Sequence, residues 1–221
     1  MGKPRQLDRP QVSFQPKTQQ QSELYHQLKH NNLLVVTGPA GTGKTFTVAT
    51  QAAQWLVNND IDRVVLARAN VPTGKSLGAI PGTLQEKLEP WLMPMTDVLR
   101  RQLGRGYYEH AMSKGKIETV ALEVIRGRSF DNAVILIDEA QQLTMDEIKA
   151  ISTRIGENAV LVLMGDPKQS DLKNKTGLIQ FIDLLDNYEL PHTCVVEFDM
   201  DDIVRSDTCA NMVRMFYTEG L

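Results

Sequence analysis

The sequence has few cysteines and no long apolar run. The two cysteines, Cys194 and Cys209, lack the spacing of a metal site, so we expect no zinc centre and two reduced thiols. The longest apolar run, AVILI at 133–137, is far below the roughly 20 residues that cross a bilayer. The N-terminus also lacks the apolar core of a signal peptide. These absences predict a soluble, cytoplasmic protein with no membrane contact.

A strong excess of one charge is also missing. The net charge is −3 over 221 residues, which argues against a globally basic nucleic-acid coat but leaves room for a local basic channel. The hydrophobic content of 42% is ordinary for a globular protein of one domain. Residues 1–16 are rich in Pro and Gln with little periodicity, so we expect an N-terminal arm there, followed by one domain over 17–221.

Short apolar runs alternate with helical segments along the chain. Helices are expected over 19–29 and 44–57, and Pro90 and Pro94 are expected to break the helix around Trp91. The runs that predict strands are 33–37, 63–69, 133–137, 159–164 and 194–198. This alternation predicts an α/β fold, with a doubly wound, mainly parallel sheet covered by helices on both faces. Polar groups at the carboxyl ends of its strands would form the site.

The segment GPAGTGKT, residues 38–45, matches a phosphate-binding loop between a strand and a helix. Its glycines allow successive N–H groups to point inward as an anion nest at a helix N-terminus. Lys44 would reach the β- and γ-phosphates, and the Thr45 hydroxyl would bind Mg²⁺. The alternative, a glycine-rich turn, is disfavoured because the whole pattern and both flanks fit. The predicted nucleotide-binding residues of this segment are Gly38, Pro39, Ala40, Gly41, Thr42, Gly43, Lys44, Thr45 and Phe46.

Two further strands end in polar residues. VILIDEAQ at 134–141 places Asp138 to hold Mg²⁺ and Glu139 to orient the attacking water, although an ordinary strand-to-helix turn would also carry such acids. LMGDPKQSDL at 163–172 places Gln169 to contact the γ-phosphate or the water, and Asp166 to support the metal shell. The order of these motifs favours a helicase superfamily one core with one RecA-like P-loop NTPase domain over a nucleoside kinase.

The segments between these motifs indicate a resemblance to one particular family. The stretches at 68–99, 126–141, 152–172 and 201–207 are similar to the PhoH family of phosphate-starvation-inducible ATPases. The resemblance covers residues 14–217 and suits a small bacterial or phage version. It implies ATP hydrolysis on a single RecA-like core, with RNA binding, helicase-like remodelling and hexameric rings. The chain departs from the family pattern at Lys75, Ala79 and Gln142.

Further site residues follow from the resemblance. Gln21 falls at the position of a glutamine that would pair with adenine. Arg205 resembles a γ-phosphate contact within its own core. Superfamily-one motors bind ATP between two cores, and this chain has one core. A neighbouring copy would therefore supply an arginine in trans, and the candidates are Arg126, Arg128 and Arg154. The rival interpretation is a nucleotide-dependent regulatory module that binds ATP and has little motor activity.

A nucleic-acid surface is predicted in two places. Seven basic residues lie between Arg100 and Arg128, with Tyr107 and Tyr108 among them, a mixture that can pair with phosphates and stack on bases of single-stranded RNA or DNA. The other interpretation of this stretch is a solvated helical face with core-facing tyrosines. The Gly- and Pro-rich loop at 70–82 is the second candidate surface.

Overall fold

The computed structural model describes residues 9–69, 84–169 and 176–219. Within these ranges one sheet of six strands has the order β3-β2-β4-β5-β1-β6, and every strand pair is parallel. The strands are β1 (Leu33–Thr37), β2 (Arg63–Arg68), β3 (Ile117–Thr119), β4 (Ala133–Asp138), β5 (Val160–Gly165) and β6 (Thr193–Glu197). The predicted parallel α/β fold is therefore confirmed.

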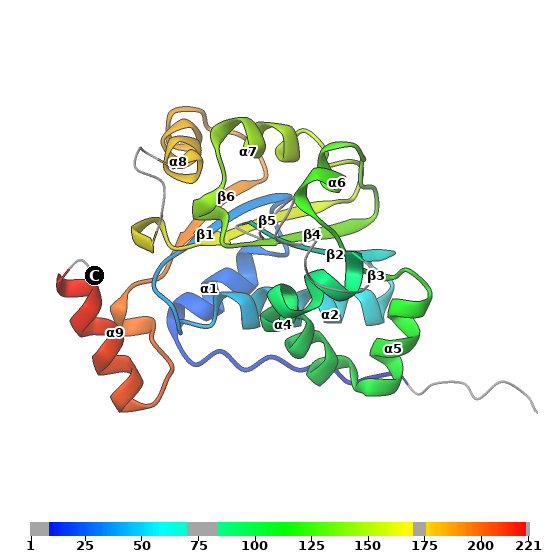
Figure 1. The fold of residues 1–221 in the computed structure, drawn as a ribbon, viewed down its shortest axis with the longest axis horizontal. Coiled ribbons are helices and arrows are strands. Elements are labelled where there is room, and N and C mark those ends of the chain that lie inside the picture. Colours follow the sequence, from blue (N-terminus) through cyan, green and yellow to red (C-terminus); the bar gives the residue numbers. More distant parts are fainter. Residues whose placement is uncertain (1–8, 70–83, 170–175, 220–221) are drawn as a thin grey trace, which may run out of the picture.

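Helices cover both faces of the sheet (Figure 1). One layer holds α1 (Gln19–Gln27), α2 (Lys44–Asn58), α4 (Leu84–Leu103) and α5 (Arg105–Ser113). The other holds α6 (Leu122–Arg126), α7 (Met145–Ser152) and α8 (Gly177–Asn187). The last helix, α9 (Asp207–Glu219), lies at one end of the molecule, apart from both layers. Short 3-10 turns follow three strands: η1 (Ala140–Gln142), η2 (Pro167–Gln169) and η3 (Met200–Asp202).

The sheet separates two apolar cores. Alternate strand residues point to opposite faces, so Leu136 packs with α2 and α4 while its neighbour Ile137 packs with α7 and α8. The central strands are buried on both sides, which explains why they read as continuous apolar runs. All five predicted strands are present within about one residue, whereas the three-residue β3 was too short to be predicted.

The prediction that Pro90 and Pro94 break a helix is wrong. Both lie inside α4, which is continuous from Leu84 to Leu103. Each proline removes one backbone hydrogen bond, but both are exposed, and the opposite side of the helix buries Leu88, Leu92 and Met95, with Leu99 beyond. This apolar stripe holds the helix to the core in spite of the lost hydrogen bonds.

The segment before α1 is anchored through two side chains. Val12 packs against the core, and the ring of Phe14 stacks on Tyr25 with 4.5 Å between centroids. Phe14 also lies 6.3 Å from the ring of Phe46 on α2. The described part of the predicted arm therefore contacts the domain, and the boundary at residue 16 stays a prediction.

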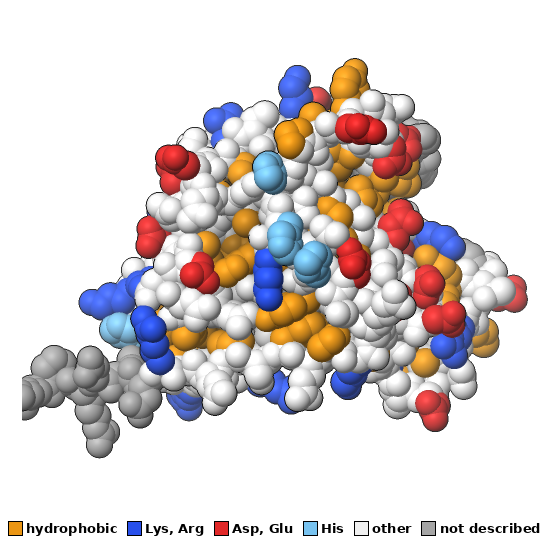
Figure 2. Space-filling model, turned by 180° about the vertical axis from the view of Figure 1, so that it is seen from behind, with side chains coloured by type: hydrophobic (Ala, Val, Ile, Leu, Met, Phe, Trp, Pro, Cys, Tyr) orange, Lys and Arg blue, Asp and Glu red, His pale blue; other side chains and the backbone are white. Residues whose placement is uncertain are grey.

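The surface shows charges of both signs. On the face seen in Figure 2, basic and acidic side chains are interspersed, in keeping with the small net charge. None of the helices in the described ranges has the length and hydropathy of a membrane span.

Candidate functional site

The carboxyl ends of four strands meet at one edge of the sheet. Thr37 at the end of β1 pairs with Gly165 at the end of β5, and Arg68 at the end of β2 pairs with Asp138 at the end of β4. A cavity of about 760 Å³ opens above this edge. It is lined by Gln15, Lys17, Gln21, Ala40, Gly41, Gly43, Lys44, Thr45, Phe46, Arg68, Pro94, Asp97, Val98, Arg101, Asp138, Glu139, Gly165, Asp166, Gln169, Val204 and Arg205.

The loop from Gly38 to Gly43 joins β1 to α2 and has the backbone of an anion nest. Gly38 and Gly43 have φ values of 129° and 87°, which side-chain-bearing residues rarely adopt. A Cβ on Gly38 would lie 2.3 Å from the carbonyl oxygen of Phe198, so the close approach also requires glycine. Within the part of the chain that the structure describes, no side chain caps the first turn of α2, and its N–H groups are available to an anion.

Lys44, the first residue of α2, folds over this loop. Its ammonium donates to the carbonyl oxygens of Gly38 at 2.6 Å and Pro39 at 2.8 Å. Burial lowers the pKa of Lys44, while the charges of Asp166, Asp138 and Glu139 act in the opposite direction. The ammonium thus lies between the loop and the carboxylates at the strand ends.

Two of these carboxylates are held where a proton or a cation is favoured. Burial raises the pKa of Asp138, and the charge of Glu139 raises it further, against the charges of Arg68 and Lys44. Burial likewise raises the pKa of Asp166. Asp166 Oδ1 accepts from the Lys168 N–H at 3.1 Å, whereas its buried Oδ2 has no hydrogen-bond partner among the described residues. Asp138 and Asp166 line the same cavity, and two carboxylates there are a donor set that suits a hard cation such as Mg²⁺.

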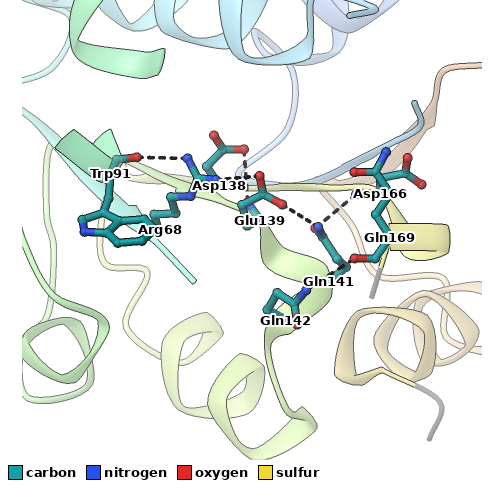
Figure 3. A network of polar contacts seen from close by, with 8 residues as sticks. All are labelled: Arg68, Trp91, Asp138, Glu139, Gln141, Gln142, Asp166 and Gln169. Carbon is teal, nitrogen blue, oxygen red and sulfur yellow. Dashed lines mark hydrogen bonds and ion pairs between the residues drawn. The ribbon is translucent and has the colours of Figure 1, made fainter. Parts of the chain in front are cut away.

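Glu139 is fixed through both carboxylate oxygens (Figure 3). Its Oε1 accepts from Arg68 Nη2 at 2.9 Å, and its Oε2 accepts from Gln141 Nε2 at 2.5 Å. Gln141 in turn accepts from the N–H of Asp166 at 3.1 Å, which joins the ends of β4 and β5. The backbone of Glu139 is left-handed, with φ 55°, a conformation that costs on the order of 1–3 kcal/mol and is held by these contacts.

Gln169 and Arg205 both line the cavity and are exposed. Gln169 belongs to η2, and its carbonyl oxygen accepts from Gln142 at 3.4 Å. Arg205 covers the loop, because a Cβ on Gly41 would lie 2.8 Å from Arg205 Cγ. The neighbouring Val204 N–H donates to Gly41 O at 3.0 Å. The segment after β6 thus closes over the phosphate loop.

Gln21, another residue of the cavity lining, connects α1 to the loop. Its Nε2 donates to Thr42 O at 2.9 Å, and its Oε1 accepts from the Lys17 N–H at 2.8 Å. Gln21 is buried, with 3% of its surface exposed. One hydrogen of its amide is already bonded to the loop backbone. Phe46, in the first turn of α2, lines the cavity beside it.

The predicted basic surface is largely paired within the chain. Arg100 pairs with Asp97, Arg105 with Glu109, Arg126 with Glu147 and Arg128 with Glu118, at N···O distances of 2.5–2.9 Å. Tyr108 is buried with 5% exposed, so the expectation that its ring stacks on bases is wrong. The ring is not available to a base because it lies in the core, where α5 packs on α4.

Two other predicted features are Arg154 and the loop at 70–82. Arg154 Nε donates to Ala150 O at 3.3 Å, and Arg154 has no ion pair among the residues that the structure covers. The loop at 70–82, with Lys75 and Ala79, lies outside the described residues.

Several residues of the site were not predicted. Arg68 and Gln141 form the Glu139 network, and Asp97 and Arg101 reach the cavity from α4. For Arg68 a signal was present, since it ends a predicted strand and so lies at the same edge as Asp138. For α4 the sequence carried no such signal, because the helix reaches the cavity through its tertiary packing on α2 and β2.

Comparisons with known proteins place this chain in a family. The family model described as PhoH-like protein matches residues 13–217. A PhoH-like protein of Bacillus subtilis (strain 168) is 36% identical over 206 residues, covering 92% of this chain and 64% of that protein. Protein PhoH of Escherichia coli (strain K12) is 34% identical over 193 residues, covering 86% of this chain and 54% of that protein. The chain thus spans less than two thirds of the length of these two relatives.

A solved structure extends the likeness to the fold. The large terminase of a thermophilic bacteriophage superposes with a TM-score of 0.54 at 14% identity, over 91% of this chain and 50% of the terminase. At 14% identity, this similarity shows a shared fold of the core and nothing beyond the fold.

Proposed function

Because this chain belongs to the PhoH-like protein family, we propose that it binds ATP with Mg²⁺ and hydrolyses the bond to the γ-phosphate. The observation that carries the proposal is one cavity that contains an uncapped helix N-terminus, the Lys44 ammonium and the carboxylates of Asp138, Glu139 and Asp166. An anion nest beside buried acids matches a polyphosphate bound together with a cation.

The phosphate-binding groups have distinct roles in this proposal. The N–H groups of the loop and Lys44 hold the β- and γ-phosphates. Thr45 and Asp138 hold the metal, with Asp166 supporting its shell. Mg²⁺ supplies charge neutralisation on the phosphate oxygens when it is bound. Gln21 and Phe46 flank the position of the base, with the second Gln21 amide hydrogen available to adenine.

Hydrolysis needs an oriented water. Glu139, held through both oxygens, still has lone pairs that can accept from the attacking water. Gln169 and Arg205 line the same cavity, and in this proposal they contact the γ-phosphate as it leaves.

Two substitutions test the proposal. Lys44→Ala removes the only ammonium that bonds to the loop carbonyls among the described residues, and it should abolish turnover. Glu139→Gln keeps the shape of the side chain but removes the base, so it should trap bound ATP and release phosphate only at a small residual rate. Phosphate release and retention of labelled ATP measure the two effects. Normal hydrolysis by either purified variant contradicts the assignment.

We further propose that the protein uses ATP turnover to act on single-stranded RNA, in a helicase-like or remodelling role. A specific observation favours a second candidate, a regulatory module that binds ATP and hydrolyses it slowly. Four of the seven basic side chains between 100 and 128 are already ion-paired within the chain and are less available to a phosphate backbone. Turnover measured with and without single-stranded RNA decides: stimulation supports remodelling, and indifference supports the module.

The same proposal includes a ring of identical subunits, six by family resemblance, in which a neighbour supplies an arginine. Arg126 and Arg128 are held by Glu147 and Glu118 of their own chain, which leaves Arg154 as the better candidate. Mixing Lys44→Ala subunits with Arg154→Ala subunits tests the shared site. Recovered turnover supports it, and full activity of a monomer contradicts it.

A further inference from the structure

Arg68 ends β2 at the same level as the proposed metal-binding carboxylate. The β2–β4 register pairs Arg68 with Asp138. Only 22% of the Arg68 side chain is exposed, so the guanidinium is largely removed from bulk water. A charge in such a place interacts more strongly with its partners than a surface charge does.

The guanidinium connects two separate elements (Figure 3). Nη2 donates to Glu139 Oε1 at 2.9 Å, and Nη1 donates to the backbone carbonyl of Trp91 in α4 at 3.1 Å. A planar guanidinium presents donors in fixed directions and can make both bonds at once. Its orientation, and with it the Glu139 carboxylate, therefore depends on where the Trp91 carbonyl lies.

The contacted turn of α4 is an unusual part of that helix. Trp91 stands between Pro90 and Pro94, neither of which can donate a backbone hydrogen bond. The next turn, with Asp97 and Arg101, lines the cavity. The helix that fixes Arg68 is thus the same helix that borders the nucleotide position.

We propose that Arg68 is a positioning residue, which holds the Glu139 carboxylate against the turn of α4 at Trp91 so that Glu139 meets the attacking water. This inference rests on the proposed hydrolysis. Arg68 acts through Glu139 and does not touch the nucleotide. Gln141 holds the second oxygen of the carboxylate, so the loss of Arg68 leaves Glu139 attached on one side and free to turn.

The main test is Arg68→Gln. Since a displacement of about 1 Å at a reacting group can cost about 100-fold in rate, we expect kcat to fall between about 10-fold and 100-fold. The affinity for ATP should stay within about threefold. Arg68→Lys keeps the charge but has one nitrogen in place of a fork, so its kcat should be intermediate.

The matched control is Arg63→Gln. Arg63 begins the same strand and also bonds to a glutamate, Glu118, at 3.2 Å, but it lies at the opposite end of β2. Loss of an ion pair there should leave kcat within about twofold. A fall in kcat equal to that of Arg68→Gln would show a general effect of weakening the strand and would overturn the inference.

A double variant separates action through Glu139 from direct action. If Arg68 acts through Glu139, Arg68→Gln combined with Glu139→Gln should turn over at the rate of Glu139→Gln alone in a single-turnover assay. Three results would overturn the role of Arg68 while leaving hydrolysis standing. One is an additional loss in the double variant equal to the loss in Arg68→Gln alone. The other two are a raised KM with unchanged kcat in Arg68→Gln, and unchanged kinetics in Arg68→Gln. Absence of turnover in the unsubstituted protein would instead refute both. Thermal unfolding of each variant establishes that it is folded, with Arg68→Lys as the milder substitution.

Discussion

Gln141 is the buried connection between the two strand ends of the site, and its replacement by Met should destabilise the fold. The side chain is 1% exposed and bonds to Glu139 and to the N–H of Asp166. Met fills nearly the same space but loses a bond to a charged acceptor, at about 1.5–3 kcal/mol, and leaves a buried N–H unpaired, at about 1–3 kcal/mol. The greater hydrophobicity of the buried thioether offsets part of this loss, by about 1.5–3 kcal/mol.

The net effect expected for Gln141→Met is a loss of about 2 kcal/mol in the free energy of unfolding. For a domain of this size that corresponds to a fall of about 4–8 °C in Tm. Urea denaturation without nucleotide, followed by circular dichroism, measures it. The control is Gln142→Met, one residue later, since Gln142 is only partly buried and its bond to Gln169 is long, at 3.4 Å.

The control should change stability by less than about 0.5 kcal/mol. An unchanged urea midpoint for Gln141→Met would show that the amide bridge contributes nothing beyond its packing. An equal loss in Gln142→Met would show that the effect belongs to the η1 turn as a whole and would refute the reasoning.

Two further predictions concern the acids and the loop. Because burial raises the pKa of Asp138, its ionised form costs stability above the unfolded value of about 3.9, so Asp138→Asn should raise the urea midpoint at pH 7. That gain should shrink as the pH is lowered toward 4, and a gain independent of pH would contradict the assignment. Gly38→Ala should weaken both stability and ATP binding, because its Cβ meets Phe198 O at 2.3 Å, whereas Gly104→Ala, with φ 72° and ψ 150° and no described atom within 4 Å of its Cβ, carries only backbone strain of about 1–3 kcal/mol. Equal losses in the two glycine variants, measured by urea denaturation and ATP titration, would exclude the contact with Phe198 as the cause.

The parts of the molecule that follow from local pattern were predictable from the sequence. Strand runs such as 133–137 are apolar because both faces of the sheet are covered, and Gly38 and Gly43 recur at a spacing that a phosphate nest requires. Parallel strands bring their carboxyl ends together, so Asp138 and Asp166 could be assigned to one site from the strand pattern alone.

The parts that depend on packing between distant segments were not predictable. The continuity of α4 through Pro90 and Pro94 depends on the burial of its other face, which propensity does not report. The partners of Arg68 and Arg126 depend on side-chain geometry across about 20 to 70 positions of the chain. The burial of Tyr108 is of the same kind, since a tyrosine beside arginines has the same sequence pattern whether it faces solvent or the core.

The strand order has a consequence for synthesis of the protein. β1, which carries the phosphate loop, pairs with β5 and β6, and Leu33 lies opposite Leu161. On a ribosome that adds about 5–20 residues per second, β1 waits on the order of ten seconds for its first partner strand. During that time a fully apolar strand has both edges open, which makes it a target for chaperones and for aggregation. The nucleotide site therefore cannot assemble before about three quarters of this sequence has been made, and ATP cannot stabilise any shorter nascent chain.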